Sequence, residues 1–214
     1  MDTEILNLDI IFRGATMPLD SFPVSVTLRD GAEITLVPLQ PSDSGELLRF
    51  YGELPEEDRA MLRDDVTTPE WAEVFLRRVE NRQVTSLVAK LDDELVGEAS
   101  LYHSQHGWTR HVGEVRLTVA PRLRRKGLAT ALASALVHLA IDRGLEKLIV
   151  QVVDYQLAAR RTFERLGFHK EATLPSHVMD MAGNKRDLLL MANGTSQIRA
   201  ALEVASQEST LQLI

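Results

Sequence analysis

The 214-residue sequence contains no cysteine, which excludes disulfide bonds, thiolate nucleophiles and metal sites built on thiolates. It also contains no long apolar run, because stretches such as Leu188–Ala192 are far shorter than the roughly 20 residues that span a bilayer. The first four residues lack the basic start of a secretory signal. We therefore expect a cytoplasmic protein with no membrane partner.

An excess of positive charge is absent as well. Lysine and arginine number 24 against 31 aspartates and glutamates, so the net charge of -7 has the wrong sign for a broad phosphate-binding surface. Neither a Walker A pattern nor a three-glycine dinucleotide fingerprint occurs, which disfavours nucleotide hydrolysis and hydride transfer. We expect no nucleic-acid partner.

The hydrophobic residues, 44% of the chain, are enough to fill the core of one α/β domain, and no repeat or linker divides the sequence. Residues 24–39 are predicted to form a hairpin around Asp30-Gly31, a turn that needs positive φ at both positions. Further strands are predicted over 83–90, 94–103 and 111–119, as an antiparallel meander, and over 147–153, 168–172 and 186–191. Helices are predicted over 47–54, from Thr68-Pro69 onward, from Leu128 to Gly144 and over 156–166.

The two ends of the chain fall outside this pattern. Residues 1–21 form an N-terminal extension, in which 6–12 carry a weak strand signal for an extra edge strand or a dimer contact. Residues 193–214 form a C-terminal tail whose apolar positions predict a short amphipathic helix, namely Ile198, Ala201, Leu202 and Ala205. The main domain is expected to cover residues 22–192.

The most informative segment runs from Val119 to Thr130, where a strand ends, a basic loop with one glycine follows, and a long helix begins. The free N–H groups of a first helical turn and the helix dipole favour an anion there, and Gly127 and Ala129 leave space for a phosphate. Cations add to this charge, namely Arg122, Arg124, Arg125 and Lys126. A solvated basic loop or a small nucleic-acid patch is the alternative interpretation.

Two motifs resemble the GNAT superfamily of N-acetyltransferases. Arg124-x-x-Gly127-x-Ala129 resembles the signature Arg/Gln-x-x-Gly-x-Gly/Ala between a strand and a long helix, and the segment from Gln156 to Phe168 resembles the second motif about 30 residues later. The resemblance covers roughly residues 22–192. It implies the GNAT fold, a mixed and mostly antiparallel sheet that splays between two parallel strands and is flanked by helices.

The resemblance also implies that acetyl-CoA lies in that splay as co-substrate. The backbone amides that would hold its pyrophosphate belong to Arg124, Arg125, Lys126, Gly127, Leu128, Ala129 and Thr130. Leu117 and Val119 would pair with the pantetheine arm, and Gln156, Ala159 and Phe163 would line the other wall. Phe163 stands where the family usually has a tyrosine that protonates the thiolate, and Gln156 stands where it has asparagine. Water and Tyr155 are the alternative acids, and Phe163 can equally be a core aromatic.

Glu114 is the candidate general base, because it lies on the strand leading into the basic loop and a carboxylate facing a cleft can accept a proton from an ammonium substrate. Relatives that acetylate protein lysines often have a glutamate at this place. A solvent-facing Glu114 is the alternative, and Glu98 on the preceding strand is the second candidate. His103, His106 and His111 are assigned to a loop or the substrate rim rather than to a metal site, and His177 to a loop at the end of the last hairpin.

These features lead to the hypothesis of direct acetyl transfer from acetyl-CoA to a primary amine, with the Val119 amide binding the carbonyl oxygen and no covalent intermediate. A protein lysine is the favoured acceptor and a small-molecule amine the alternative. A coenzyme A-binding sensor or assembly module without turnover is the competing class, supported by Phe163. A homodimer is also considered, through the chain ends.

Overall fold

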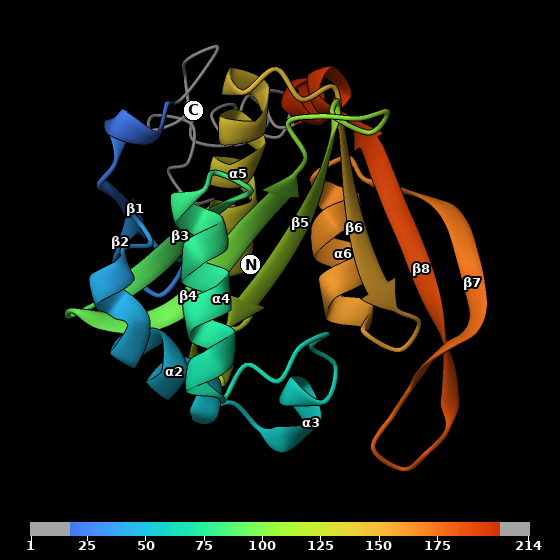
Figure 1. Cartoon of the computed structure of the whole chain (residues 1–214), viewed down its shortest axis with the longest axis horizontal. Helices are drawn as coiled ribbons and strands as arrows, with labels where there is room; N and C mark the ends of the chain where they lie inside the picture. The colour runs from blue at the N-terminus through green and yellow to red at the C-terminus, as the bar shows by residue number, and fades with distance from the viewer. Residues whose placement is uncertain (1–17, 202–214) are drawn as a thin grey trace.

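The computed structural model describes residues 18–201, which fold into an eight-stranded mixed sheet with helices on both faces (Figure 1). The strands are β1 (Val24–Thr27), β2 (Glu33–Pro38), β3 (Val84–Leu91), β4 (Glu94–His103), β5 (Val112–Val119), β6 (Lys147–Val153), β7 (His169–Met179) and β8 (Lys185–Gly194). The α-helices are α2 (Ser44–Gly52), α3 (Glu56–Arg59), α4 (Pro69–Glu80), α5 (Leu128–Asp142) and α6 (Leu157–Arg165). Short 3-10 turns cover Leu19–Ser21, Pro41–Asp43 and Pro121–Leu123.

The strands lie in the order β1-β2-β3-β4-β5-β6-β8-β7, and every neighbouring pair is antiparallel except β5 and β6. The fold inferred from the sequence is therefore confirmed. The one parallel pair divides the sheet into a meander on one side and the β6-β8-β7 unit on the other.

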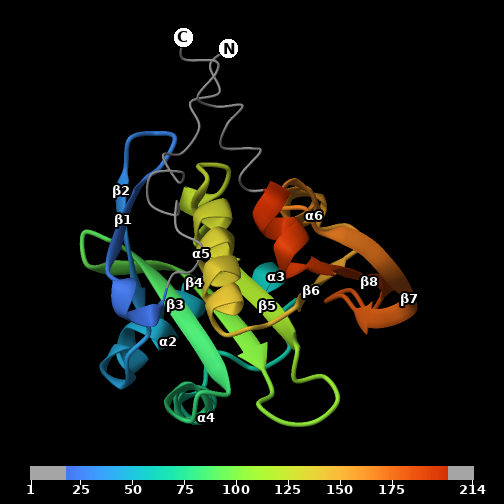
Figure 2. The same cartoon turned by 90° about the horizontal axis from the view of Figure 1, so that it is seen from above.

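The helices form two layers around the sheet (Figure 2). α5 packs on one face, and most of its residues are buried because alanine and leucine fill nine of its 15 positions. Phe163 of α6 belongs to the same core as α5. α2 and α4 cover the opposite face, where Phe50, Tyr51 and Phe75 form a second core. No helix within residues 18–201 is long and apolar enough to cross a membrane.

Several element boundaries agree with the local signals that predicted them. Thr68 caps α4 by accepting a hydrogen bond from the Trp71 amide at 3.2 Å, with Pro69 in the first turn. Asp92 and Asp93 both have positive φ, 49° and 65°, as a two-residue hairpin turn between β3 and β4 requires.

Three local predictions were wrong. In the first hairpin only Gly31 has positive φ, 83°, and Leu28 N–H donates to the Ala32 carbonyl, so the loop has three residues instead of two. The four-residue α3 was missed, because one helical turn is too short to show a periodicity. His177 lies in β7 rather than in a loop, because β7 and β8 continue past the predicted ends with a register irregularity between Leu174 and Val178.

The chain ends are described in part. Residues 195–201 are helical, and Ile198 is fully buried in the main core. The weak strand signal over 6–12 and the predicted tail positions Leu202 and Ala205 lie outside the described residues.

Candidate active site

β5 and β6 separate part of the way along their length. The parallel pairing covers only Val112–Glu114 against Lys147–Ile149, although β5 continues to Val119 and β6 to Val153. Beyond Glu114 and Ile149, the backbone N–H and C=O groups that point into the gap between the two strands have no partner in the β5–β6 ladder. The splay expected between two parallel strands is therefore present, with Glu114 at its vertex.

The cleft-facing backbone of β5 follows from its pairing with β4. Val119 is opposite Gly97, and the neighbouring Ala120 N–H donates to the Val96 carbonyl at 2.9 Å. In an antiparallel ladder this makes Val119 a non-hydrogen-bonded position, whose own N–H and C=O point away from β4. Because the pattern repeats every two residues, Leu117 has the same orientation. Both therefore direct backbone groups toward the β6 side, as pairing with an extended ligand requires.

The start of α5, at the end of β5, has the backbone geometry that an anion cradle requires. Gly127, the N-cap, has φ of 100°, a conformation that favours glycine, and Arg125 before it is also left-handed at 64°. The first hydrogen bond of this turn runs from the Ala131 N–H to the Gly127 carbonyl at 3.0 Å. The N–H groups of residues 128–130 precede it and are therefore not used by the i to i−4 hydrogen bonds of the helix. Leu128 is fully buried, so its side chain belongs to the core and not to a ligand surface.

Three cations of the basic loop are already paired with carboxylates. Each ion pair ties the loop to another element, and the pairs are Arg122–Glu94 at 2.6 Å, Arg124–Asp58 at 2.6 Å and Lys126–Asp30 at 2.8 Å. Arg125 is the exposed cation of the loop without an ion pair among residues 18–201. The positive charge left free for an anion is therefore smaller than the four-residue cluster suggests.

The opposite wall comes from the end of β6 and the start of α6. The Gln156 Oε1 accepts a hydrogen bond from the Val153 N–H at 3.0 Å, which satisfies a backbone donor at the end of β6. Ala159 is partly buried against the main core. Phe163 is 8% exposed and packs edge-on against Phe168 with ring centroids 5.4 Å apart. Phe163 is thus a core aromatic without a proton to donate.

Glu114 projects from β5 to the α4 side, because it is paired opposite Tyr102 and shares a face with it. Its carboxylate contacts two guanidinium groups, Arg63 at 2.8 Å and Arg116 at 3.1 Å, and its side chain is 19% exposed. Glu114 also borders a pocket of about 720 Å³ together with Ile149 of β6. It is therefore neither a free surface carboxylate nor a fully buried one.

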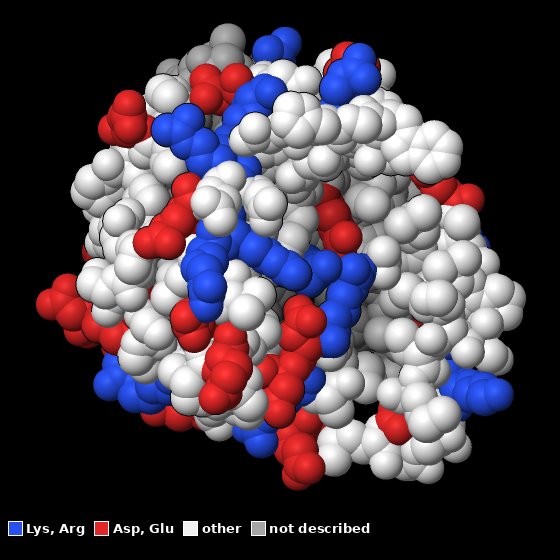
Figure 3. Space-filling view, viewed as in Figure 1, with Lys and Arg blue, Asp and Glu red and all other residues white. Residues whose placement is uncertain are grey.

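The loop between α3 and α4 lies over this vertex. Arg63 binds Glu114, and Asp64 lies 3.7 Å from Arg116. On the other side of the splay, the Tyr155 hydroxyl contacts the Met61 sulfur at 2.6 Å. Figure 3 shows basic and acidic side chains interleaved across the middle of this face, whereas the β7–β8 side is mostly uncharged. A substrate that reaches Glu114 from this face therefore meets the Met61–Asp64 loop.

Glu98, the second candidate base, is buried within the sheet and is only 2% exposed. It accepts hydrogen bonds from the hydroxyls of Tyr51 at 3.0 Å, Ser86 at 2.6 Å and Ser100. Burial raises its pKa above the usual range, against the opposing effect of these hydroxyls. The sequence did not show this network, because Tyr51 comes from α2 and Ser86 from the neighbouring strand. Its burial makes Glu98 a positioning group in the sheet rather than a base open to solvent.

Glu98→Gln is expected to gain stability relative to wild type as pH rises above about 4.5, the ordinary pKa of a glutamate. The folded protein holds the Glu98 proton more tightly than the unfolded chain, so wild-type stability falls as pH rises through the raised pKa. Glutamine does not titrate, so the variant does not lose stability in this way as pH rises. Thermal unfolding of both proteins between about pH 4.5 and 7.5 measures the difference, with the exposed Glu53→Gln as control. A difference independent of pH would show that Glu98 does not titrate in this way.

The three histidines considered for a metal do not converge. No group of three or more metal-ligating side chains occurs within residues 18–201. Instead His103 contacts Arg143 at 2.8 Å, and His106 and His111 are exposed. His106 and His111 lie in the loop between β4 and β5, and His103 is the last residue of β4. Their place at the substrate rim stays a prediction.

Comparison with known proteins identifies the family. The model of the GNAT acetyltransferase family matches residues 48–168. Thialysine N-epsilon-acetyltransferase of Caenorhabditis elegans is 27% identical over 134 residues, which are 62% of this chain and 81% of that protein. Two solved structures share the fold with TM-scores of 0.66. Ribosomal-protein-alanine N-acetyltransferase from Brucella melitensis is 22% identical, and the match covers 74% of this chain and 98% of that chain. RimJ from Mycobacterium smegmatis, in complex with CoA-disulfide, is 19% identical and covers 86% of this chain and 93% of its own. Because the family model spans more than half of the sequence, this protein belongs to the GNAT family of acetyltransferases.

Proposed function

We propose that this acetyltransferase moves an acetyl group from acetyl-CoA directly to a primary amine, with Glu114 as the general base. The observation that carries the proposal is the position of Glu114 at the vertex of the β5–β6 splay, where pairing with β6 ends. The anion cradle at Gly127 lies at the end of the same strand. One strand thus connects a site for the cofactor's phosphates with a carboxylate that can take a proton.

The residues present fit acetyl-CoA, which would supply an activated acetyl thioester when bound. The left-handed Gly127 and the unused amides at the start of α5 suit a pyrophosphate, and the cleft-facing backbone of Leu117 and Val119 suits the amides of a pantetheine arm. The Val119 N–H is the proposed donor to the carbonyl oxygen. Gln156 retains its amide N–H₂ group for the opposite wall, because only its oxygen is bound to Val153.

The proposed acceptor is a lysine side chain on a protein. Glu114 is held by Arg63, which is 39% exposed and reaches it from the α3–α4 loop. An incoming ammonium group can replace the Arg63 guanidinium, so that the Glu114 carboxylate keeps a positively charged partner. The relative that acetylates ribosomal-protein alanine favours a protein acceptor, whereas the thialysine relative favours a small amine.

Release of free coenzyme A from acetyl-CoA, measured with lysine-containing peptides, free lysine and spermidine, tests the function. Faster release with a peptide than with either small amine supports the proposal. Faster release with free lysine or spermidine identifies a small-molecule acetyltransferase. If calorimetry detects acetyl-CoA binding but no amine causes release of coenzyme A, the second candidate, a coenzyme A-binding module, is favoured. The observation behind this candidate is that Phe163 has no hydroxyl group.

The proton that neutralises the leaving thiolate comes from Tyr155 or from water, since Phe163 has none to give. Tyr155 follows the end of β6, and partial burial raises its pKa above 10, so its phenol is protonated at neutral pH. If Tyr155 is the donor, Tyr155→Phe is expected to lower kcat by about tenfold or more while leaving acetyl-CoA affinity unchanged. An unchanged kcat would assign the step to water.

A further inference from the structure

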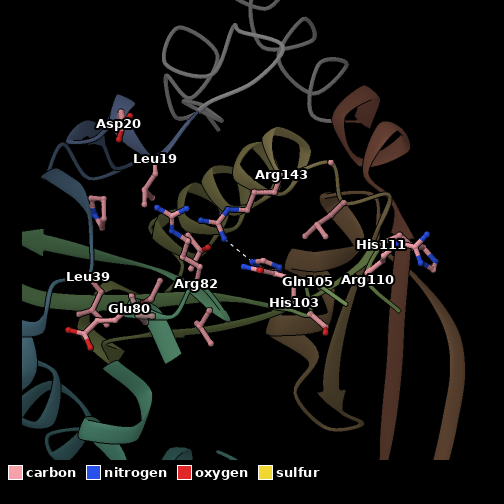
Figure 4. A pocket seen from close by; sticks show the side chains of 18 of the residues that line it. Leu19, Asp20, Leu39, Glu80, Arg82, His103, Gln105, Arg110, His111 and Arg143 are labelled. Carbon is pink, nitrogen blue, oxygen red and sulfur yellow. Dashed lines mark hydrogen bonds between the residues drawn. The ribbon is translucent and has the colours of Figure 1, made fainter. Parts of the chain in front are cut away.

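A cavity of about 1060 Å³ lies at the C-terminal end of α5, away from the phosphate cradle at its start (Figure 4). Because α5 has 15 residues, its two ends are roughly 20 Å apart. The cavity is bordered by the turn after α5, the end of α4, the start of β3, the end of β4 and the loop that precedes β5. None of the residues assigned above to acetyl-CoA or to Glu114 chemistry lines it.

Two arginines meet in this cavity. Figure 4 shows the side chains of Arg82 and Arg143 next to each other. Within residues 18–201 neither has a carboxylate within ion-pair distance, although Asp20 and Glu80 also border the cavity. Burial lowers the pKa of Arg143. The negative charge of Asp142 raises this pKa, and the positive charge of Arg82 lowers it. Two like charges are thus held next to each other, with Arg143 partly buried and Arg82 exposed.

The polar partner of Arg143 does not compensate this charge. Its NH1 group lies 2.8 Å from His103 Nε2. A guanidinium can only donate, so His103 must accept and is therefore neutral. Burial, together with the charge of Arg143, lowers the pKa of His103 and favours the same neutral form. The arginine pair keeps its full positive charge.

Thr85 gives an independent indication of a ligand. It is 3% exposed, it borders the cavity, and its hydroxyl has no hydrogen-bond partner. Buried hydroxyls are nearly always satisfied, because leaving one unpaired is destabilising. Thr85 is paired opposite Leu101, which lies in the core beneath α5, so its side chain is on the α5 side of the sheet together with Arg143.

The backbone at Arg82 is also unusual. It follows the end of α4 with φ of 57°, and the hydrogen bonds from Arg82 to Val79 and from Gln83 to Arg78 form the helix-ending motif that normally places glycine there. An arginine in this conformation is strained. The guanidinium group therefore occupies a position where local stability favours a residue without a side chain.

We propose that this cavity binds a small organic anion, with a phosphate or carboxylate group between Arg82 and Arg143 that accepts a hydrogen bond from the Thr85 hydroxyl. An anion neutralises the arginine pair and satisfies Thr85 at the same time. The volume leaves room for the organic part of the ligand. The site uses none of the residues proposed to bind acetyl-CoA, although it shares Val84, His103, Ser104 and Gln105 with the pocket beside Glu114.

Calorimetric titration of the full chain with inorganic phosphate and, separately, with citrate tests the site and distinguishes the two anion types. Wild type is expected to bind at least one of them, and Arg143→Gln and Arg82→Gly to weaken binding by about tenfold or more. Arg82→Gly is included because glycine suits the backbone there and should not impair folding. Thr85→Val is expected to weaken binding several-fold while raising the unfolding temperature of the ligand-free protein, because it removes an unsatisfied hydroxyl.

Two matched variants complete the experiment. Arg49→Gln removes an exposed charge on α2 and is expected to leave anion binding unchanged. Arg125→Gln removes the unpaired charge of the phosphate cradle. If Arg125→Gln abolishes binding and the cavity variants do not, the anion binds at the start of α5 and the proposal is wrong. It is equally overturned if wild type binds neither probe, or if binding survives in Arg82→Gly and Arg143→Gln.

Discussion

Glu114→Gln is expected to lower kcat by about two to three orders of magnitude at neutral pH, within the range that a positioned general base contributes. A lysine-like amine with a pKa near 10.4 must lose a proton before it attacks, which costs about 4.6 kcal/mol at pH 7. Without the carboxylate the reaction depends on amine that is already neutral. The rate of the variant should then rise about tenfold per pH unit below the amine pKa, and its deficit should narrow in alkaline buffer.

The two arginines on Glu114 require a control for charge. Glu114→Gln leaves Arg63 and Arg116 without their shared carboxylate, and this alone can displace the loop. The double variant with Arg63→Gln restores the charge balance. If Glu114 is the base, the double variant stays as slow as the single one. Recovery of activity in the double variant would mean that Glu114 acts by holding Arg63 and the loop, not by taking a proton.

The elements that the sequence predicted well are those with local causes. The cap of α4 depends on Thr68 and Pro69 alone, and the turn between β3 and β4 on Asp92 and Asp93. β6 is apolar apart from Lys147 and Gln151 and was located at Lys147–Val153 as predicted. In contrast, the single turn of α3 has no periodicity, and the irregular end of β7 depends on Ser176, whose N–H donates to the Asp187 side chain 11 residues away.

The residues of the candidate site could likewise be predicted only where their causes are local in the sequence. Gly127 and Glu114 could be selected from the sequence, because the loop and its strand are contiguous in the chain. The partners that determine how these residues behave come from distant segments. Arg63 reaches Glu114 across 51 positions, and Asp58 reaches Arg124 across 66. No local pattern predicts such contacts, so the pairing of the basic loop appears only in the folded chain.

The buried groups were the least predictable. Glu98 stands in a strand next to glycine and alanine, and nothing around it in the sequence indicates that Tyr51 of α2 will bind it at 3.0 Å. The cavity beside Thr85 likewise combines the end of α4 with the end of α5. Both depend on helices packing against opposite faces of the sheet, which is a consequence of the tertiary fold.

Gly127→Glu is expected to abolish measurable acetyl-CoA binding, with a loss of affinity of more than about 100-fold. The variant places a negative charge at the helix start, where the pyrophosphate would take the free amides, and like charges brought together there cost several kcal/mol. It also forces a side chain into φ of 100°. Calorimetry of wild type and variant, with circular dichroism to verify the fold, measures the loss.

Gly127→Ala separates charge from backbone strain. Alanine meets the same unfavourable φ, at a cost of roughly 1 to 2 kcal/mol, but adds no charge. Weak binding by the alanine variant and none by the glutamate variant would assign the effect to the anion cradle. Equal loss in both would assign it to the shape of the loop. If wild type itself fails to bind acetyl-CoA, the splay and cradle are a family architecture without its co-substrate, and the transferase mechanism at Glu114 has to be abandoned together with its acceptor.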